Sequence, residues 1–500
     1  MNYKKGIRNI SYSVIGQVAS LALGIFIPRL VIVSYGSDVN GLLSSIGQVM
    51  TYLALLEAGL GAAAIQALYK PISQDDKNGI SAIVSAASRS YKKIGYIYLT
   101  LIVCLSFTFP LVVRTDLNYW FIWVLVLING MPGVINFLFQ GKLRILMNSE
   151  GDGYVLTNFS TVITVFTSVM KIVLLSMQVN IVFVQLMYCG TSLVQMTFIS
   201  WYVKKHYPWL DMKRAPDYDA LKRRNPAFLH QICGLVTNST DVMLLTVFRD
   251  LKEVSIYSVY NMSFNLVFNV LSSVTFGTQF MLGQEYYKDK AHYTKIINTY
   301  ETVYMALSTA LMLVVYVMIT PFLKLYTAGA DIDYINNAFP LLFFLVKILE
   351  LYRNSAVLTA SIAGHFEETK WHAIIESVIN LGLSILFVNK YGMIGVLFGT
   401  VAAFVFRDVV SIIYSNRKIL NRSFILPFKK IILNAFIAII MMLCCRGIDW
   451  YGSTYLVLIL KAIPLTAISV CVFMALNLII DHSSYMICME FIKAKVHRPK

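Results

Sequence analysis

Residues 53–71 read LALLEAGLGAAAIQALYKP, an apolar stretch with a carboxylate, Glu57, near its centre and two glycines, Gly59 and Gly61, close behind it. Glycine weakens a helix, and a charge in the middle of a bilayer costs at least ~2.5–3.5 kcal/mol. Glycines also let a second helix approach closely, or let their own helix bend. The stretch therefore predicts a closely packed membrane helix whose carboxylate has a partner or lines a wet cavity.

The composition of the whole chain also indicates a membrane protein. Of its 500 residues, 57% are hydrophobic and 14% are charged, and its mean hydropathy is +0.67. A soluble protein carries about 25% charged residues, and a bilayer span needs roughly 20 apolar ones. The apolar ranges near that length are 9–34, 40–69, 93–115, 118–146, 154–177, 179–203, 227–248, 254–283, 296–321, 335–363, 371–389, 394–415, 431–446 and 454–479. They predict an all-α polytopic membrane protein with about fourteen transmembrane helices.

Lysine and arginine predict the orientation of these spans. If the N-terminus is cytoplasmic, 30 of the 42 Lys and Arg residues fall in the termini and inner loops, and six fall in outer loops. Positive charge gathers on the cytoplasmic side, so both termini are expected there. The net charge of +16 follows mostly from this bias, and no nucleic-acid partner is expected. The first span is expected to stay as an anchor, and the seven cysteines, none in an outer loop, are expected to form no disulfides.

Loop composition divides the chain into three parts. The charged inner loop 204–226 follows the sixth span, and the basic loop 416–430 follows the twelfth. We therefore predict an N-terminal lobe at 1–213, a C-terminal lobe at 214–425, and a third part at 426–500 with two further spans and a cytoplasmic tail.

The motifs of common membrane and soluble enzymes are missing from the sequence. It has no phosphate-binding Gly-rich loop ending in Lys-Ser/Thr, no HExxH, no CxxC and no GxSxG. The predicted outer loops are short, so they leave little room for chemistry outside the membrane. The sequence therefore predicts a transporter rather than an enzyme, with no cofactor and no metal site.

The tenth span carries the densest group of charges inside the membrane. Lys347, Glu350 and Arg353 are three residues apart, which places them on one helix face. One interpretation is a ladder in which Glu350 pairs with its two neighbours. The other is a cavity lining, in which two cations and one anion leave a positive surplus that suits an anionic ligand.

Single charges occur in other spans, and each is a candidate for a buried counter-charge or a coupling-ion site. They are Glu57, Lys171, Asp241, Arg407 and Asp408. Glu57 is expected to pair with a basic residue of its own half, such as Lys171. Glu301 and Glu376 lie near predicted inner helix ends, where they are expected to reach headgroups or water.

Amide side chains form a stripe along the eighth span. Asn261, Asn265 and Asn269 are four residues apart, and Gln17 belongs to a similar polar stripe in the first span. Such stripes often join helices by hydrogen bonds. They equally suit a wet cleft, so these four residues are candidates for a polar cavity lining.

Residues 28–71 extend the opening stretch into a longer pattern. The pattern consists of Tyr35-Gly36, Asn40-Gly41-Leu42, Glu57-Ala58-Gly59-Leu60-Gly61 and Tyr69-Lys70-Pro71. It resembles the N-terminal signature of Wzx-type polysaccharide flippases, which belong to the multidrug/oligosaccharidyl-lipid/polysaccharide exporter (MOP) superfamily. A weaker echo, DVMLLTVFRDLKEVSIYSVYN, begins the second half at residue 241.

This resemblance implies a V-shaped pair of six-helix lobes, two additional C-terminal helices and alternating access. The implied substrate is an undecaprenyl-diphosphate-linked oligosaccharide, moved from the inner to the outer leaflet of the bacterial cytoplasmic membrane. By their place in the spans, Arg29, Lys347 and Arg353 would form the cationic cavity that holds it. The implied partners are membrane lipids, a polysaccharide polymerase and a chain-length protein. The implied energy source is the membrane potential or an H⁺ or Na⁺ gradient.

Three other functions stay open at the level of sequence. A multidrug cation antiporter of the same superfamily would use a buried acid such as Glu57 or Asp241, although the first span has none. A membrane polysaccharide polymerase would need long outer loops with reactive residues, and a channel would need a repeated pore loop. A diphosphate carries about two negative charges, and each gains ~2.3 kcal/mol per 100 mV on moving out of an inside-negative cell, which favours the flippase.

Overall fold

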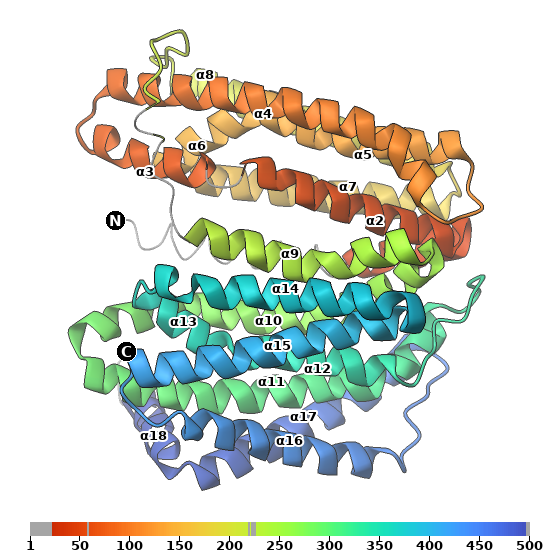
Figure 1. The fold of residues 1–500 in the computed structure, drawn as a ribbon, viewed down its shortest axis with the longest axis vertical. Helices are drawn as coiled ribbons and strands as arrows, with labels where there is room; N and C mark the ends of the chain where they lie inside the picture. The colour runs from red at the N-terminus through yellow and green to blue at the C-terminus, as the bar shows by residue number, and fades with distance from the viewer. Residues whose placement is uncertain (1–22, 58–59, 219–220, 222–226, 497–500) are drawn as a thin grey trace. The chain divides into compact units, whose positions relative to one another are not determined.

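The computed structural model describes residues 23–57, 60–218, 221 and 227–496. Within these residues all regular structure is helical (Figure 1). The contacts divide the chain into two compact units. The first comprises residues 1–235, 245–255 and 330–332, and the second comprises 236–244, 256–329 and 333–500. The domain boundaries expected near residues 213 and 425 stay predictions.

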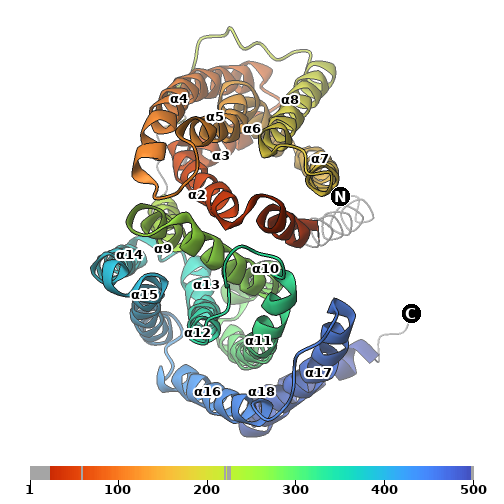
Figure 2. The ribbon, with the colours of Figure 1, turned by 90° about the vertical axis from the view of Figure 1, so that its right-hand side faces the viewer.

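The first unit is a bundle of helices that run nearly parallel, so Figure 2 looks along several of them. Its helices are Leu23–Tyr35, α2 (Ser37–Leu53), α3 (Leu60–Ser73), α4 (Lys77–Val112), α5 (Tyr119–Ile135), α6 (Gly141–Ser149), α7 (Gly153–Ser176) and α8 (Ile181–His206). Side-chain caps start three of them. The carboxylate of Asp76 accepts from the amides of Asn78 and Gly79 at α4, and Asn118 and Asn180 cap α5 and α8.

The predicted span 40–69 is a broken helix rather than a continuous one. Its first helix, α2, ends in a 3₁₀ turn at Ala54–Glu57, and α3 begins at Leu60. Within the same unit, segment 245–255 packs directly on α2. The amide of Asn40 donates to the Ser255 hydroxyl at 2.8 Å, and a Cβ at Gly41 would clash with the carbonyl oxygen of Leu251. Glycine at position 41 therefore allows a backbone contact that any other residue would block.

The second unit contains the remaining helices. They are α9 (Ala227–Phe248, shared with the first unit), α10 (Leu251–Lys288), α11 (Lys290–Tyr326), α12 (Phe339–Tyr352), α13 (Asn354–Ile362), α14 (Phe366–Tyr391), α15 (Met393–Tyr414), α16 (Ile425–Cys445), α17 (Tyr455–Ile480) and α18 (His482–Val496). Small residues let α14 and α15 lie in close contact, as Figures 1 and 2 both show. At Gly395 and Gly399 a Cβ would meet the Phe387 backbone and the Ser384 hydroxyl.

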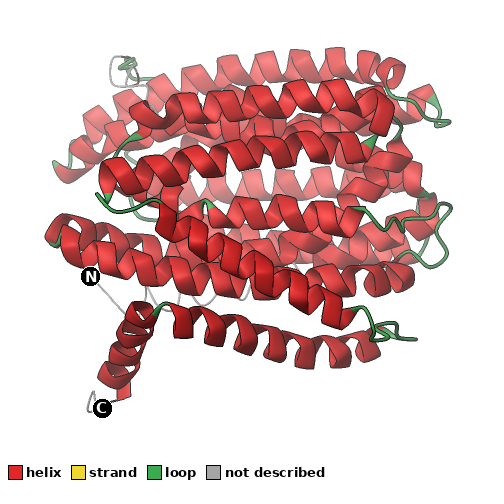
Figure 3. Cartoon of the chain, turned by 60° about the horizontal axis from the view of Figure 1, so that its bottom comes forward, coloured by secondary structure: helices red, strands yellow, loops and turns green. Residues whose placement is uncertain are grey.

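The last helices form a hairpin with its own polar contact. Asn434 of α16 and Asn477 of α17 donate to each other's side-chain oxygens at 3.1 and 3.0 Å, and both are almost fully buried. The reciprocal pair fixes the register of the two helices. The short helix α18 follows and turns sharply away from the direction of α17 (Figure 3).

The fold confirms a polytopic membrane protein. Among the described residues, ten helices are long and apolar enough to cross a membrane, and Leu23–Tyr35 and Ser239–Phe248 are shorter apolar helices. Each predicted span from residue 40 onward coincides with a helix, or with a broken one as at α12 and α13, and the described part of the first span lies in the helix Leu23–Tyr35. At 38 and 37 residues, α10 and α11 would be about 55 Å long, so they extend beyond a hydrocarbon core of about 30 Å.

Candidate functional site

The candidate site is a polar cavity of about 230 Å³ inside the second unit. Two helices supply its charges: Asp241 comes from α9, and Lys347 and Glu350 come from α12. The Lys347 ammonium donates to the Glu350 carboxylate at 3.1 Å and lies 4.9 Å from the centre of the Phe268 ring of α10. The expected ladder on the tenth span is therefore present for one of its two pairs.

Asp241 is held by hydroxyl groups from two neighbouring helices. Tyr257 of α10 donates to its carboxylate at 3.0 Å, and Thr400 of α15 lies 3.0 and 3.1 Å from its two oxygens. The amide of Asn380 in turn donates to Thr400 at 2.9 Å. These donors replace water around a buried anion, which is the condition for keeping one inside an apolar bundle.

The amide stripe of α10 lies along the same cavity. Asn261, Asn265 and Asn269 all line it, together with the aromatic rings of Phe268, Phe343 and Phe404. Amides four residues apart share a helix face, which is why one helix can present all three. Each amide both donates and accepts, so the stripe can bind hydroxyl-rich molecules as well as water.

The cavity carries more acid than base. Asp241 and Glu350 face a single ammonium, that of Lys347. The positive surplus expected from the tenth span alone is therefore offset by carboxylates of neighbouring helices. In chemical terms the cavity suits a cation or a neutral polyol better than an isolated anion.

A second buried charge cluster adjoins the cavity through Phe404. The Arg353 guanidinium donates to Glu376 of α14 and stacks on the Phe404 ring at 4.3 Å. Arg407 of α15 lies 3.7 Å from the other oxygen of Glu376. Asp408, 4% exposed, completes the set, and neither of its carboxylate oxygens has a hydrogen-bond partner among the described residues. We call Arg353, Glu376, Arg407 and Asp408 the charge tetrad.

The tetrad changes the assignment of two residues. Arg353 pairs with Glu376 of α14 and not with Glu350 of α12, the partner expected within the tenth span. Glu376 was expected to reach headgroups or water, but it is 6% exposed and lies between two arginines. The tetrad holds two cations and two carboxylates, so it needs no ligand to balance it.

The charged residues of the first unit lie in different surroundings. Tyr91 of α4 donates its hydroxyl to Glu57, and the guanidinium of Arg144 interacts electrostatically with both groups. Lys171 lies 4.3 Å from the centre of the Tyr188 ring instead, so the expected pairing of Glu57 with Lys171 is wrong. The Tyr91 hydroxyl bonds the carboxylate, and Arg144 is the basic residue of the same unit that interacts with it electrostatically.

Two predicted site residues belong to the start of the chain. Arg29 is half-buried in helix Leu23–Tyr35 of the first unit. Gln17 lies outside the described residues, as does the rest of its polar stripe up to residue 22. The described part of the chain contains no group of three His, Cys, Asp or Glu residues that could hold a metal ion.

Sequence reasoning missed the uncharged residues that complete the site. Tyr257, Thr400 and Asn380 are single polar residues in apolar helices, without a spacing that would link them to Asp241. The pairing of Glu376 could have been predicted, because two arginines inside predicted spans require carboxylates nearby.

Solved structures with a similar fold are membrane transporters. The chain matches "Lipid II flippase MurJ, inward closed conformation" with a TM-score of 0.67 and 14% identity, over 93% of this chain and 98% of that one. An inward-facing multidrug resistance MATE family transporter of the MOP superfamily matches with a TM-score of 0.59 and 16% identity, over 81% and 98%. An outward-facing structure of a multidrug resistance MATE family transporter matches with a TM-score of 0.53 and 16% identity, over 83% of this chain and 96% of that one.

At these identities the likeness shows the fold. No protein-family model and no curated protein matches the chain. The expected all-α exporter fold is confirmed by the structural matches.

Proposed function

We propose, from the premise that this chain has the fold of the MOP exporters, that it is a flippase for a lipid-linked oligosaccharide. The substrate would be a repeat unit on undecaprenyl diphosphate, destined for capsule, O-antigen or another cell-surface polysaccharide. Alternating access would move it from the inner to the outer leaflet of a bacterial cytoplasmic membrane. A polymerase and a chain-length protein would act on the product.

The observation that carries this proposal is the extent of the structural match. The lipid II flippase covers 93% of this chain, whereas the two MATE transporters cover 81% and 83% while matching nearly all of their own length. The part of this chain that the MATE transporters leave uncovered is comparable in length to residues 426–500. These are 75 of the 500 residues, and they contain α16, α17 and α18. The fold match extends over more of this chain with the lipid flippase than with the MATE transporters, and this supports a lipid-linked substrate.

The polar cavity supports the oligosaccharide half of the substrate. Asn261, Asn265 and Asn269 provide donors and acceptors that sugar hydroxyls match, and the rings of Phe268 and Phe343 provide flat apolar surfaces. The carboxylates of the cavity suit hydroxyl donors as well.

The diphosphate half calls for cations. We propose Arg29 and Lys347 as its contacts, since a guanidinium fork and an ammonium both bind phosphate. Arg353 is proposed to position α12 against α14 rather than to touch the substrate, because it is bonded to Glu376 and, unlike Lys347, does not line the polar cavity. The membrane potential, or an H⁺ or Na⁺ gradient coupled through Asp241, Glu350 or Asp408, would drive transport.

One observation favours a second function, a multidrug cation antiporter. Asp241 and Glu350 outnumber Lys347 in the cavity, and an organic cation would restore the balance. The aromatic rings of Phe268, Phe343 and Phe404 would also suit such a ligand.

Deletion and complementation in the source organism separate these functions. A flippase deletion should accumulate lipid-linked repeat units on the inner leaflet, protected from an impermeant glycosidase in intact cells, while susceptibility to cationic drugs stays unchanged. Loss of drug resistance with normal polysaccharide would establish the antiporter instead. Single repeat units exposed outside would indicate a polymerase.

A matched pair of variants connects the phenotype to the cavity. Lys347→Gln should fail to complement at normal protein levels, whereas Lys390→Gln, an exposed lysine of the same unit, should complement fully. Full complementation by Lys347→Gln would remove Lys347 from the proposed site.

Orientation has its own test. In a background without exposed native cysteines, Ala328→Cys should react with an impermeant thiol reagent in intact cells, and Gln74→Cys should react only after lysis. Both positions are exposed loop or turn residues. The reverse pattern would invert the predicted topology.

A further inference from the structure

A second and larger cavity lies at one end of the second unit. It has a volume of about 850 Å³ and is enclosed by α11, the loop before α16, the first half of α16, the end of α17, and α18. It shares no lining residue with the polar cavity described above. The loop bias of lysine and arginine predicts that this end is cytoplasmic.

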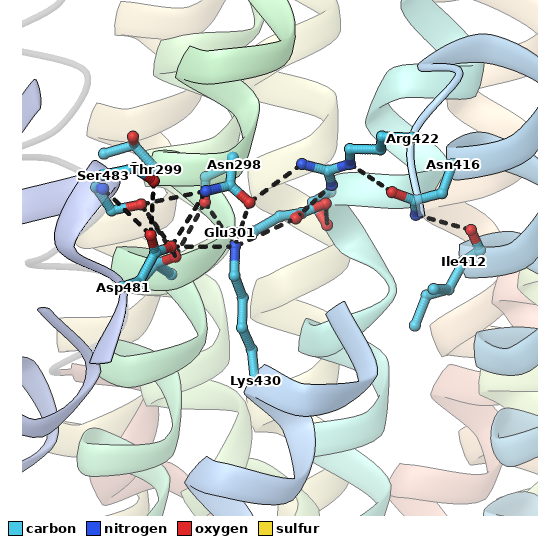
Figure 4. A network of polar contacts seen from close by, with 12 residues as sticks. Asn298, Thr299, Glu301, Ile412, Asn416, Arg422, Lys430, Asp481 and Ser483 are labelled. Carbon is cyan, nitrogen blue, oxygen red and sulfur yellow. Dashed lines mark hydrogen bonds and ion pairs between the residues drawn. The ribbon is translucent and has the colours of Figure 1, made fainter. Parts of the chain in front are cut away.

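The floor of this cavity is a closed network of charges (Figure 4). Lys430, 8% exposed, donates to the backbone and side-chain oxygens of Asn298 at 2.9 and 2.8 Å and lies 3.6 Å from Glu301. Arg422 donates to Glu301 at 2.5 Å. Asp481 lies 3.7 Å from Lys430. Two cations and two carboxylates thus balance one another in the floor.

The rim adds two cations that the network does not use. Lys295 of α11 and Lys429 of α16 line the cavity and are exposed. Neither forms an ion pair with any residue that the structure describes. With the floor balanced, these two lysines give the cavity a positive surplus at its entrance.

The walls are apolar and continue onto the outer faces of the helices. Leu426 and Ile480, 43% and 64% exposed, line the entrance, and Leu433 lies deeper along α16. Beyond the cavity, Ile432 and Ile479 are 68% and 72% exposed on the same two helices. Such surfaces on membrane helices face acyl chains.

The place of the cavity fits the boundary between lipid and water. It lies where α17 ends and α11 and α16 begin, so its rim coincides with span ends. The 15-residue helix α18, too short to cross a bilayer, turns away from α17 and contributes the exposed side chain of Met486 to the cavity (Figure 3). An apolar wall under a cationic rim at this depth matches an amphiphile with an anionic head.

We propose that this cavity binds an anionic phospholipid of the adjacent leaflet, with its phosphate at Lys295 and Lys429 and an acyl chain along Leu433 and Ile480. A zwitterionic lipid would leave the cationic surplus unbalanced, and a soluble phosphate would leave the apolar walls empty. The bound lipid would join α18 and the α16–α17 hairpin to α11. This inference does not depend on the proposed substrate of the polar cavity.

The test uses the purified full-length protein in detergent. Dioleoyl phosphatidylglycerol is titrated and followed by native mass spectrometry and by the melting temperature. Parallel titrations use dioleoyl phosphatidylcholine and glycerol phosphate. Wild-type protein should bind phosphatidylglycerol at least about tenfold more tightly than either, because only that lipid offers both a net anionic head and a chain.

Two double variants form a matched pair. Lys295→Gln/Lys429→Gln should weaken phosphatidylglycerol binding roughly 30-fold, about fivefold for each lysine. Lys288→Gln/Lys418→Gln removes the same charge from exposed positions outside the cavity and should leave binding unchanged. All four side chains lie at the surface or outside the floor network, so the lipid-free melting temperatures should agree.

Three outcomes would overturn the inference. If both double variants lost the same affinity for phosphatidylglycerol, general surface charge rather than the cavity would explain the binding. If phosphatidylcholine bound as tightly as phosphatidylglycerol, the cationic rim would not select for an anionic lipid. Binding of glycerol phosphate as tight as that of the lipid would make the cavity a site for a soluble anion.

Discussion

Glu57 and Asp241 are both carboxylates inside predicted spans, one in each unit, yet their surroundings differ. Glu57 is partly exposed and accepts a hydrogen bond from the hydroxyl of the buried Tyr91, beside Gly61, whereas Asp241 is 3% exposed. Asp241 is held by Tyr257 and Thr400, and its helix borders a cavity of about 230 Å³. The first carboxylate is bonded by a side chain of its own unit, whereas the second borders a cavity with room for a ligand.

The difference teaches that a charge inside a span does not by itself indicate function. A satisfied carboxylate in a packed core has the properties of a structural contact. A carboxylate beside an amide-lined cavity has a place for a ligand to bind. If this distinction is correct, variants of the packed sites should change stability, and variants of the cavity should change transport.

The largest loss of stability is expected from Arg353→Ala in the charge tetrad. Glu376 would keep its buried charge without its hydrogen-bonded partner, at a cost of about 3–5 kcal/mol in the free energy of unfolding. Denaturant unfolding in detergent measures it. The matched control is Lys370→Ala, which breaks a surface pair with Glu367 and should cost less than about 1 kcal/mol.

A second substitution identifies the partner of Arg353. Adding Glu376→Gln to Arg353→Ala should recover part of the lost stability, and adding Glu350→Ala should not. If adding Glu350→Ala recovered the stability lost in Arg353→Ala, the relevant partner of Arg353 would be Glu350 on the tenth span. The tetrad would then not be the contact that stabilises the fold.

A moderate loss is expected from Tyr91→Phe in the first unit. The variant removes one hydroxyl that bonds a carboxylate, which is worth about 1.5–3 kcal/mol in the free energy of unfolding. Transport per folded molecule should be unchanged. Tyr119→Phe serves as the control, since the Tyr119 hydroxyl donates to a backbone carbonyl, that of Phe107, rather than to a carboxylate. Lost transport at normal stability would make Glu57 a coupling site.

Asn265→Ala should show the opposite pattern. Its amide faces the cavity, so the change in the free energy of unfolding should stay below about 1 kcal/mol, while transport falls about two- to tenfold for one lost hydrogen bond. The control is Asn129→Ala, whose amide bonds a carbonyl of its own helix. A destabilised protein with full transport per folded molecule would place the amide stripe among the structural contacts.

The smallest effect concerns the pH dependence at the end of α17. Burial alone would raise the pKa of Asp481, but hydrogen bonds from Ser483, Ser484 and Thr302 and the charge of Lys430 lower it to about 2. An unfolded Asp has a pKa of about 3.9, so the stabilisation is fully present above that pH and disappears as the pH falls through about 2.

The magnitude is of order 1 kcal/mol, because the group is partly exposed and water screens it. Melting temperatures between pH 5 and pH 2.5, compared for wild type and Asp481→Asn, measure this difference. The variant should lose less stability than wild type over this range. Identical pH profiles would show that the contacts of Asp481 do not stabilise the folded state.

The sequence was sufficient for the features that local geometry determines. Runs of apolar residues predicted the helices because a bilayer leaves few alternatives, and a spacing of four placed Asn261, Asn265 and Asn269 on one face. The pair Lys347–Glu350 followed from a spacing of three in the same way. Each of these inferences involves one helix only.

Contacts between helices could not be predicted from the sequence, since they depend on how segments that are far apart in the chain are oriented against each other. Glu376 and Glu301 were expected to reach headgroups or water, yet they bind Arg353 and Arg422 from other segments of the chain. At Ala54–Glu57 the sequence left two outcomes open, a close helix contact at the glycines or a bend, and the contacts of α3 with α4 and α6 accompany the bend.

The reciprocal amide pair of Asn434 and Asn477 has a consequence for biogenesis. A lone asparagine entering the bilayer must find a partner among helices that are already in place. Here the two helices carry their own partner, and they are joined by the short segment between Cys445 and Tyr455. The hairpin α16–α17 can therefore leave the insertion machinery as one satisfied unit and add to a bundle that has already assembled.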